Sequence, residues 1–95
     1  MPEDCADLSE ETARAGDEYY RTVTTWATEG GRSPELGKKA SRLATIYNKA
    51  LQKLIDCLHR MRRTLRIQRK IDNAAEFQAL LQTDLELLES REETT

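Results

Sequence analysis

The stretch from Ala40 to Leu65, ASRLATIYNKALQKLIDCLHRMRRTL, decides the fold. Apolar residues recur in it at alternating steps of four and three, the spacing of a helix that packs along another helix. The residues of this seam are Ala40, Ala44, Tyr47, Leu51, Leu54, Leu58, Met61 and Leu65. Neither Gly nor Pro occurs from residue 38 onward, so the pattern predicts one long helix over residues 34–71.

Two short pairs of residues mark the start of this long helix. Gly30 and Gly31 end the segment that comes before it. Ser33 is a favoured N-cap residue, and Pro34 suits the first helical position because its missing N–H would have no partner there. The sequence therefore predicts a turn near residue 32.

A second amphipathic segment precedes the glycines. Three large apolar residues recur on one of its faces at helical spacing, namely Tyr19, Val23 and Trp26. They predict a first helix over residues 9–29. We expect residues 1–8, which are rich in acids, to form a disordered tail.

The third predicted helix follows Asp72. Asn73 and Glu76 have the spacing of a capping box, with Asn in place of the usual Ser or Thr. Apolar residues then recur at helical spacing, at Phe77, Leu80, Leu81, Leu85 and Leu88. We therefore predict a helix over residues 73–90 and a disordered tail over 91–95. The alternative is a single unbroken helix over residues 34–90.

The predicted fold is all-α: one helical domain over residues 9–90, in which two shorter helices lie antiparallel on the long central helix. At about 1.5 Å per residue, each shorter helix covers only half of the long one. Two helices in contact bury too little apolar area to be stable, so we expect a homodimer that forms a helical bundle. The expected oligomer seam consists of Tyr47, Leu51, Leu54, Leu58, Met61 and Leu65.

Charge is distributed unevenly along the chain. Residues 1–31 have a net charge of −6, residues 32–70 of +10, and residues 71–95 of −6, within a total of −2. Near the end of the long helix, six bases fall within one arc of the helical surface. This basic stripe within residues 59–70 consists of His59, Arg62, Arg63, Arg66, Arg69 and Lys70.

Three interpretations of the basic stripe are open. It can pair with the two acidic segments of the chain, bind an acidic protein helix, or bind nucleic-acid phosphates. The pI of about 5.4 and the absence of aromatic residues among the arginines argue against nucleic acid.

The sequence offers no reactive cluster. His59 is the only histidine, and no acid or nucleophile is spaced to work with it, so we predict no catalytic residue, metal site or cofactor. Cys5 and Cys57 lie in different sequence contexts and are not expected to pair. No signal peptide or run of ~20 apolar residues is present, which favours a cytoplasmic protein in a reducing compartment without membrane association.

These features predict a non-enzymatic interaction module: an adaptor, chaperone-like protein or assembly subunit. It would act through helix-on-helix packing and acidic–basic complementarity, with a helical, partly acidic protein as its partner. The alternative is a regulator that binds nucleic acid through the basic stripe.

Overall fold

The computed structural model describes the backbone of residues 5–94 and the side chains of residues 5–90. It contains three helices: α1 over Ala6–Thr28, α2 over Pro34–His59 and α3 over Leu65–Thr94. The predicted all-α class is confirmed, because no strand occurs within residues 5–94. The helices form an elongated bundle of 48 × 19 × 17 Å.

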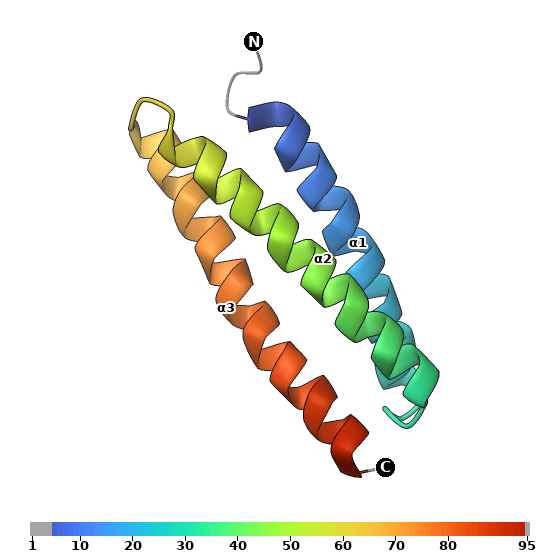
Figure 1. Ribbon diagram of the computed structural model, residues 1–95. Helices are drawn as coiled ribbons and strands as arrows, with labels where there is room; N and C mark the ends of the chain where they lie inside the picture. The colour runs from blue at the N-terminus through green and yellow to red at the C-terminus, as the bar shows by residue number, and fades with distance from the viewer. Residues whose placement is uncertain (1–4, 95) are drawn as a thin grey trace.

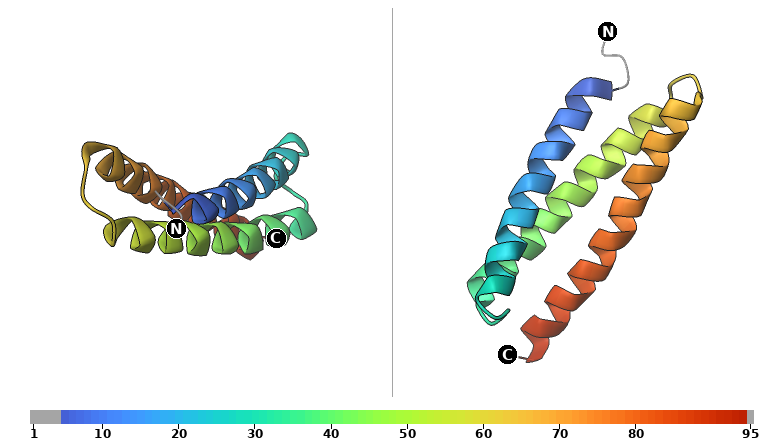
Figure 2. Two further views of the ribbon diagram at one scale, coloured as in Figure 1. Left: turned by 90° about the horizontal axis from the view of Figure 1, so that it is seen from above. Right: turned by 180° about the vertical axis from the view of Figure 1, so that it is seen from behind.

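Helix α2 is the centre of the bundle, and both α1 and α3 pack on it (Figure 1). The start of α1 lies against the end of α2, where Thr12 donates to the carbonyl of Ala50 at 3.3 Å. In the view from behind, α1 and α3 both lie in front of α2, and they diverge toward the 60–64 turn (Figure 2, right). We call the end of the bundle that carries this turn the tip.

The predicted turn near residue 32 is confirmed. The Ser33 hydroxyl accepts a hydrogen bond from the N–H of Leu36 at 3.3 Å, and Pro34 occupies the first helical position. Gly30 and Gly31 have φ angles of 86° and 67°, values that side chains with a Cβ rarely adopt. The glycine pair is therefore required by the backbone of this turn.

The predicted break near Asp72 is wrong, and so is the alternative of an unbroken helix over residues 34–90. Helix α2 ends at His59, and the Thr64 hydroxyl caps α3 by accepting from the N–H of Ile67 at 3.2 Å. The physical reason is burial: the chain turns back after Leu58, so that Ile67 and Ile71 enter the core. Asn73 lies inside α3 and caps nothing.

The limits of the outer helices also differ from the prediction. Helix α1 begins at Ala6 because Cys5 and Leu8 pack against the end of α2, so residues 5–8 are not a disordered tail. Helix α3 continues to Thr94, so residues 91–94 are helical. The remaining tail residues, 1–4 and 95, lie outside the described part of the chain.

The earlier turn lengthens α3, so that both outer helices run along most of α2. The expectation that each would cover only half of α2 is therefore wrong, and with it the argument that one chain has too thin a core. Three apolar clusters lie along the bundle. The central cluster contains Tyr19, Tyr47, Leu51 and Leu81, and we call the end with Trp26, Ala40 and Leu88 the closed end.

The residues of the predicted oligomer seam differ in their exposure to solvent. Tyr47, Leu51 and Leu58 are buried by the chain's own helices. Leu54 and Met61 are half-buried, Met61 within the turn, and Leu65 is 81% exposed at the start of α3.

Candidate partner-binding groove

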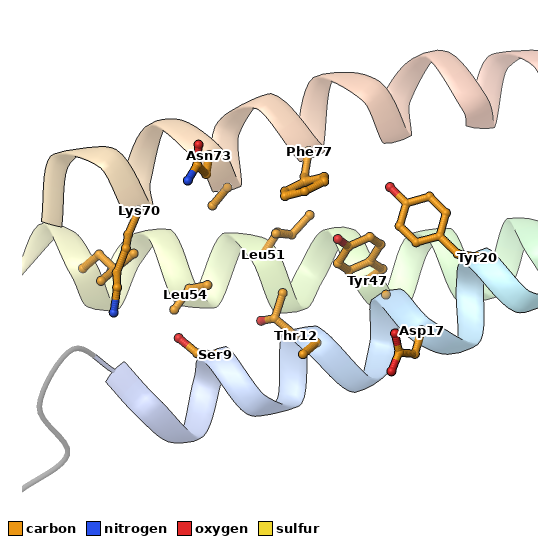
Figure 3. Close-up of a pocket in the computed structure, with 14 residues that line it drawn as sticks. Ser9, Thr12, Asp17, Tyr20, Tyr47, Leu51, Leu54, Lys70, Asn73 and Phe77 are labelled. Atoms are coloured by element: carbon orange, nitrogen blue, oxygen red, sulfur yellow. The ribbon is translucent and has the colours of Figure 1, made fainter. Parts of the chain in front are cut away.

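An apolar groove of about 390 Å³ runs between α1 and α3 in the half of the bundle nearer the tip (Figure 3). Its floor is the face of α2 formed by Tyr47, Leu51, Leu54 and Leu58. Its walls come from α1 and α3, with Ser9, Thr12, Ala13, Gly16, Asp17 and Tyr20 on one side and Lys70, Asn73, Ala74 and Phe77 on the other. The groove exists because α1 and α3 contact opposite flanks of the α2 seam. Leu54 is half-buried in its floor, whereas Tyr47, Leu51 and Leu58 are buried.

Two aromatic side chains stand at the rim of the groove. Tyr20 on α1 and Phe77 on α3 are each 41% exposed, although both line the apolar surface. Large apolar side chains that are half in solvent are candidate contacts for a partner. The rim can therefore offer aromatic area to a bound side chain.

A tyrosine cluster closes the groove away from the tip. The hydroxyl of buried Tyr19 donates to the carboxylate of Asp84 at 2.9 Å, which links α1 to α3. The ring of Tyr20 packs edge-on against the rings of Tyr19 and Tyr47, at centroid distances of 5.1 and 6.1 Å. Burial and the Asp84 carboxylate raise the pKa of Tyr19 far above its ordinary value.

Gly16 sets how closely Tyr47 approaches α1. A Cβ at Gly16 would lie 3.0 Å from the Tyr47 ring, so the glycine provides the space that the ring occupies. Burial raises the pKa of the Tyr47 hydroxyl, and its neighbour Tyr20 raises it further. The cluster is therefore neutral and tightly packed at neutral pH.

The prediction that the basic stripe lies on one helix is wrong, because the 60–64 turn falls inside the stripe. His59 ends α2, Arg62 and Arg63 lie in the turn, and the other three members occupy the first turns of α3, namely Arg66, Arg69 and Lys70. All six still lie in the turn or within two helical turns of it, and we call them the basic cluster at the tip. Arg63 fixes the turn by donating to Gln68 at 2.7 Å, with His59 3.2 Å away.

Two of the six bases already interact with other groups of the chain, namely Arg66 and Lys70. Within α1, Arg14 forms an ion pair with Glu10 at 3.9 Å, and both side chains are exposed.

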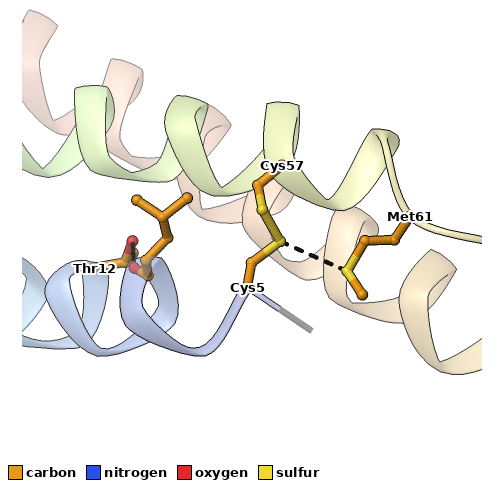
Figure 4. Close-up of a disulfide and its surroundings, with 5 residues drawn as sticks. Cys5, Thr12, Cys57 and Met61 are labelled. Atoms are coloured by element: carbon orange, nitrogen blue, oxygen red, sulfur yellow. Dashed lines mark hydrogen bonds between the residues drawn. A yellow bond between two sulfur atoms is a disulfide. The ribbon is translucent and has the colours of Figure 1, made fainter. Parts of the chain in front are cut away.

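The expectation that Cys5 and Cys57 would not pair is wrong. They form a disulfide with a Cα–Cα distance of 6.2 Å, and Cys5 Sγ lies 3.6 Å from Met61 Sδ (Figure 4). The bond fastens the start of α1 to the end of α2 beside the groove. The predicted turn near residue 32 contained the signal, because it places these two cysteines level with each other.

The disulfide is at odds with a reducing compartment, because disulfides persist mainly in oxidising ones. In the part of the chain that the structure describes, none of the helices is long and apolar enough to cross a membrane. Within those residues, no group of three or more His, Cys, Asp or Glu side chains is placed to hold a metal ion.

Comparisons with known proteins leave the groove as the main guide to function. No protein-family model, curated protein or solved structure matches this chain.

Proposed function

We propose that the protein is a non-enzymatic interaction module that receives the apolar face of one amphipathic helix in the groove between α1 and α3. The observation that supports this most directly is the apolar groove itself, with half-buried Leu54 in its floor and half-exposed Tyr20 and Phe77 at its rim. A helix that lays its apolar face in such a groove is a common mode of peptide recognition.

The dimensions of the groove favour a helix as the ligand. The α1 wall runs from Ser9 to Tyr20, which corresponds to about three helical turns or ~17 Å. A bound helix would give the bundle a fourth helix beside α1 and α3, as in four-helix bundles. Tyr20 and Phe77 would then be buried at the edges of the contact.

The basic cluster at the tip supports an acidic partner. Arg62 and Arg69 are exposed next to the end of the groove that is lined by Lys70. Charges at the rim of an interface mainly accelerate association and select partners, and they add little affinity by themselves. We therefore assign specificity to the cluster and binding energy to the apolar groove with its rim residues Tyr20 and Phe77.

A library of displayed 14-residue amphipathic helices, selected on the intact protein, tests the proposal. The variant Ala13→Trp fills the groove from an exposed position of its α1 wall, and Ala79→Trp adds the same side chain at an exposed position of α3 outside the groove. Selected peptides should lose binding to Ala13→Trp by more than tenfold and keep it on Ala79→Trp. Equal binding to both variants, or failure to select any peptide, contradicts the proposal.

A regulator that binds nucleic acid is the second candidate, because the exposed arginines gather at one free end of the bundle. Its test is the salt dependence of binding to duplex and single-stranded DNA or RNA. If the tip contacts phosphates, Arg62→Ala with Arg69→Ala should flatten the plot of log affinity against log salt by about two. Absence of binding near physiological salt leaves the helix-binding module.

A further inference from the structure

The two ends of α3 carry opposite charges. The basic cluster lies at the tip, whereas α3 ends at the opposite end of the bundle (Figure 1). In sequence, residues 84–93 carry five acids against one base. Since the bundle is 48 Å long, these two regions are several Debye lengths apart in physiological salt. The acidic end of α3 therefore cannot reach the basic tip of its own copy.

Helix α3 also has an apolar strip that this chain leaves uncovered. Phe77, Leu80 and Leu87 fall within an arc of ~80° on the helix. Leu80 and Leu87 are 52% and 54% exposed, and Phe77 lines the groove. The strip therefore borders the groove and continues from it toward the C-terminal end of α3.

The direction of α3 fits the groove of a second copy. Helices α1 and α3 both begin at the tip, so a helix that runs toward the tip would lie opposite in direction to both walls. Such a helix brings the negative end of its dipole to the basic cluster. In α3 that negative end also carries the acids Glu86 and Glu89.

We infer that two copies of this chain form a symmetric dimer in which α3 of each copy lies in the groove of the other, with its acidic end at the other's basic tip. The arrangement is self-complementary, as a two-fold interface requires. Leu80 of both copies would lie near the axis, and Leu87 of each would contact the groove of the other between its rim residues Tyr20 and Phe77. The inference rests on the proposed function, because it names the helix that the groove receives.

Sedimentation of the intact, disulfide-bonded protein at 1–100 μM tests the inference. We expect a species of twice the 10.9 kDa of one chain. Leu80→Glu should weaken the dimer more than 100-fold, since it places two carboxylates near the axis. The matched control is Ile46→Glu, which changes an apolar residue of similar exposure (56%) on α2, away from the strip, and should leave the dimer intact.

Two further variants separate the groove from the charges. Ala13→Trp should dissociate the dimer by filling the groove, and Ala79→Trp should not. Arg62→Glu with Arg69→Glu should weaken the dimer about tenfold at low salt, and Glu86→Lys with Glu89→Lys added should restore it. Circular dichroism confirms that each variant remains helical.

Each outcome decides the matter. The inference is overturned by a monomer at every concentration or by a higher oligomer. It is also overturned by a dimer that survives Leu80→Glu or by one that Ile46→Glu disrupts. If the chain is monomeric but selected peptides still lose binding to Ala13→Trp, the proposed function stands and only the second copy is rejected as its partner.

Discussion

The two halves of the bundle hold α1 in place by different means. At the closed end, Trp26, Ala40 and Leu88 form a buried apolar cluster, and at its border with the central cluster Tyr19 is hydrogen-bonded to α3. Toward the tip, α1 and α3 separate, and the disulfide between Cys5 and Cys57 fastens α1 to α2. The difference shows how α1 stays on α2 beside the groove: a covalent bond adds to the apolar cluster of Leu58, Ile67 and Ile71 at the tip.

The largest expected effect comes from removing the bond at the tip. Cys5→Ser with Cys57→Ser opens a loop with a sequence separation of 52 residues, which should lower the free energy of unfolding by about 4 kcal/mol. Urea unfolding at low micromolar concentration measures this loss, and dithiothreitol should reproduce it in the wild-type protein only. Hydrogen exchange should accelerate mainly in residues 6–16. Uniform acceleration along α1 would contradict a division into two halves.

Two truncations of leucine compare the closed core with the groove. Leu81 is 1% exposed in the central cluster, so Leu81→Ala should cost about 3 kcal/mol. Leu54 is half-buried in the groove floor, so Leu54→Ala should cost about 1 kcal/mol because less apolar area is lost. Equal losses in urea unfolding would show that the groove floor is as tightly packed as the core.

The hydrogen bond between Tyr19 and Asp84 marks the boundary between the two halves. Tyr19→Phe should cost about 1 kcal/mol, since it removes this bond and leaves the ring in place. Burial, followed by Asp84, raises the pKa of Tyr19 in the folded state, so folding favours the neutral hydroxyl. That contribution is fully present below the unfolded pKa of about 10 and is lost as the pH rises above it.

Unfolding measured at pH 8 and pH 11 checks this sign. Tyr19→Phe should lose less stability over that interval than the wild-type protein. The variant should retain some decline, because burial raises the pKa of Tyr20 and Tyr47 as well. An unchanged decline would exclude Tyr19 as a cause.

The smallest effect concerns two glycines beside Trp26 at the closed end. Gly37 lies in α2, and an added Cβ would be an ordinary 3.5 Å from the indole nitrogen. Gly37→Ala should therefore raise stability by about 0.5–1 kcal/mol through helix propensity. Gly31 has a φ of 67°, so Gly31→Ala should instead lower stability by about 1 kcal/mol. Thermal unfolding of both variants tests the opposite signs.

The first turn could be predicted from sequence and the second could not. Gly30 and Gly31 can be recognised because residue type determines which backbone angles are accessible. The second turn has neither Gly nor Pro, and Met61 and Leu65 continue the apolar spacing of α2 through it. The available signal was the phase of Ile67 and Ile71, which fall outside that seam because they belong to the core face of α3.

The parts of the candidate site also differ in whether they could be predicted from sequence. That the bases are near one another follows from their sequence positions, and the two cysteines could have been paired from the register set by the first turn. The groove could not be predicted, because it depends on how far α1 and α3 lie apart on α2. That separation is set by packing of all three helices, with the Gly16–Tyr47 contact on one side.

The disulfide also determines how the molecule would carry a mechanical load. Force applied between the two ends of the described chain enters at Cys5 and crosses directly to Cys57, so it bypasses α1 and nearly all of α2. Helix α3 lies outside the loop that the disulfide closes, so it would unfold away from α2 while that loop stays intact. Under load, α1 and α2 would therefore stay together as a disulfide-closed pair, and α3, which bears the apolar strip, would separate from them.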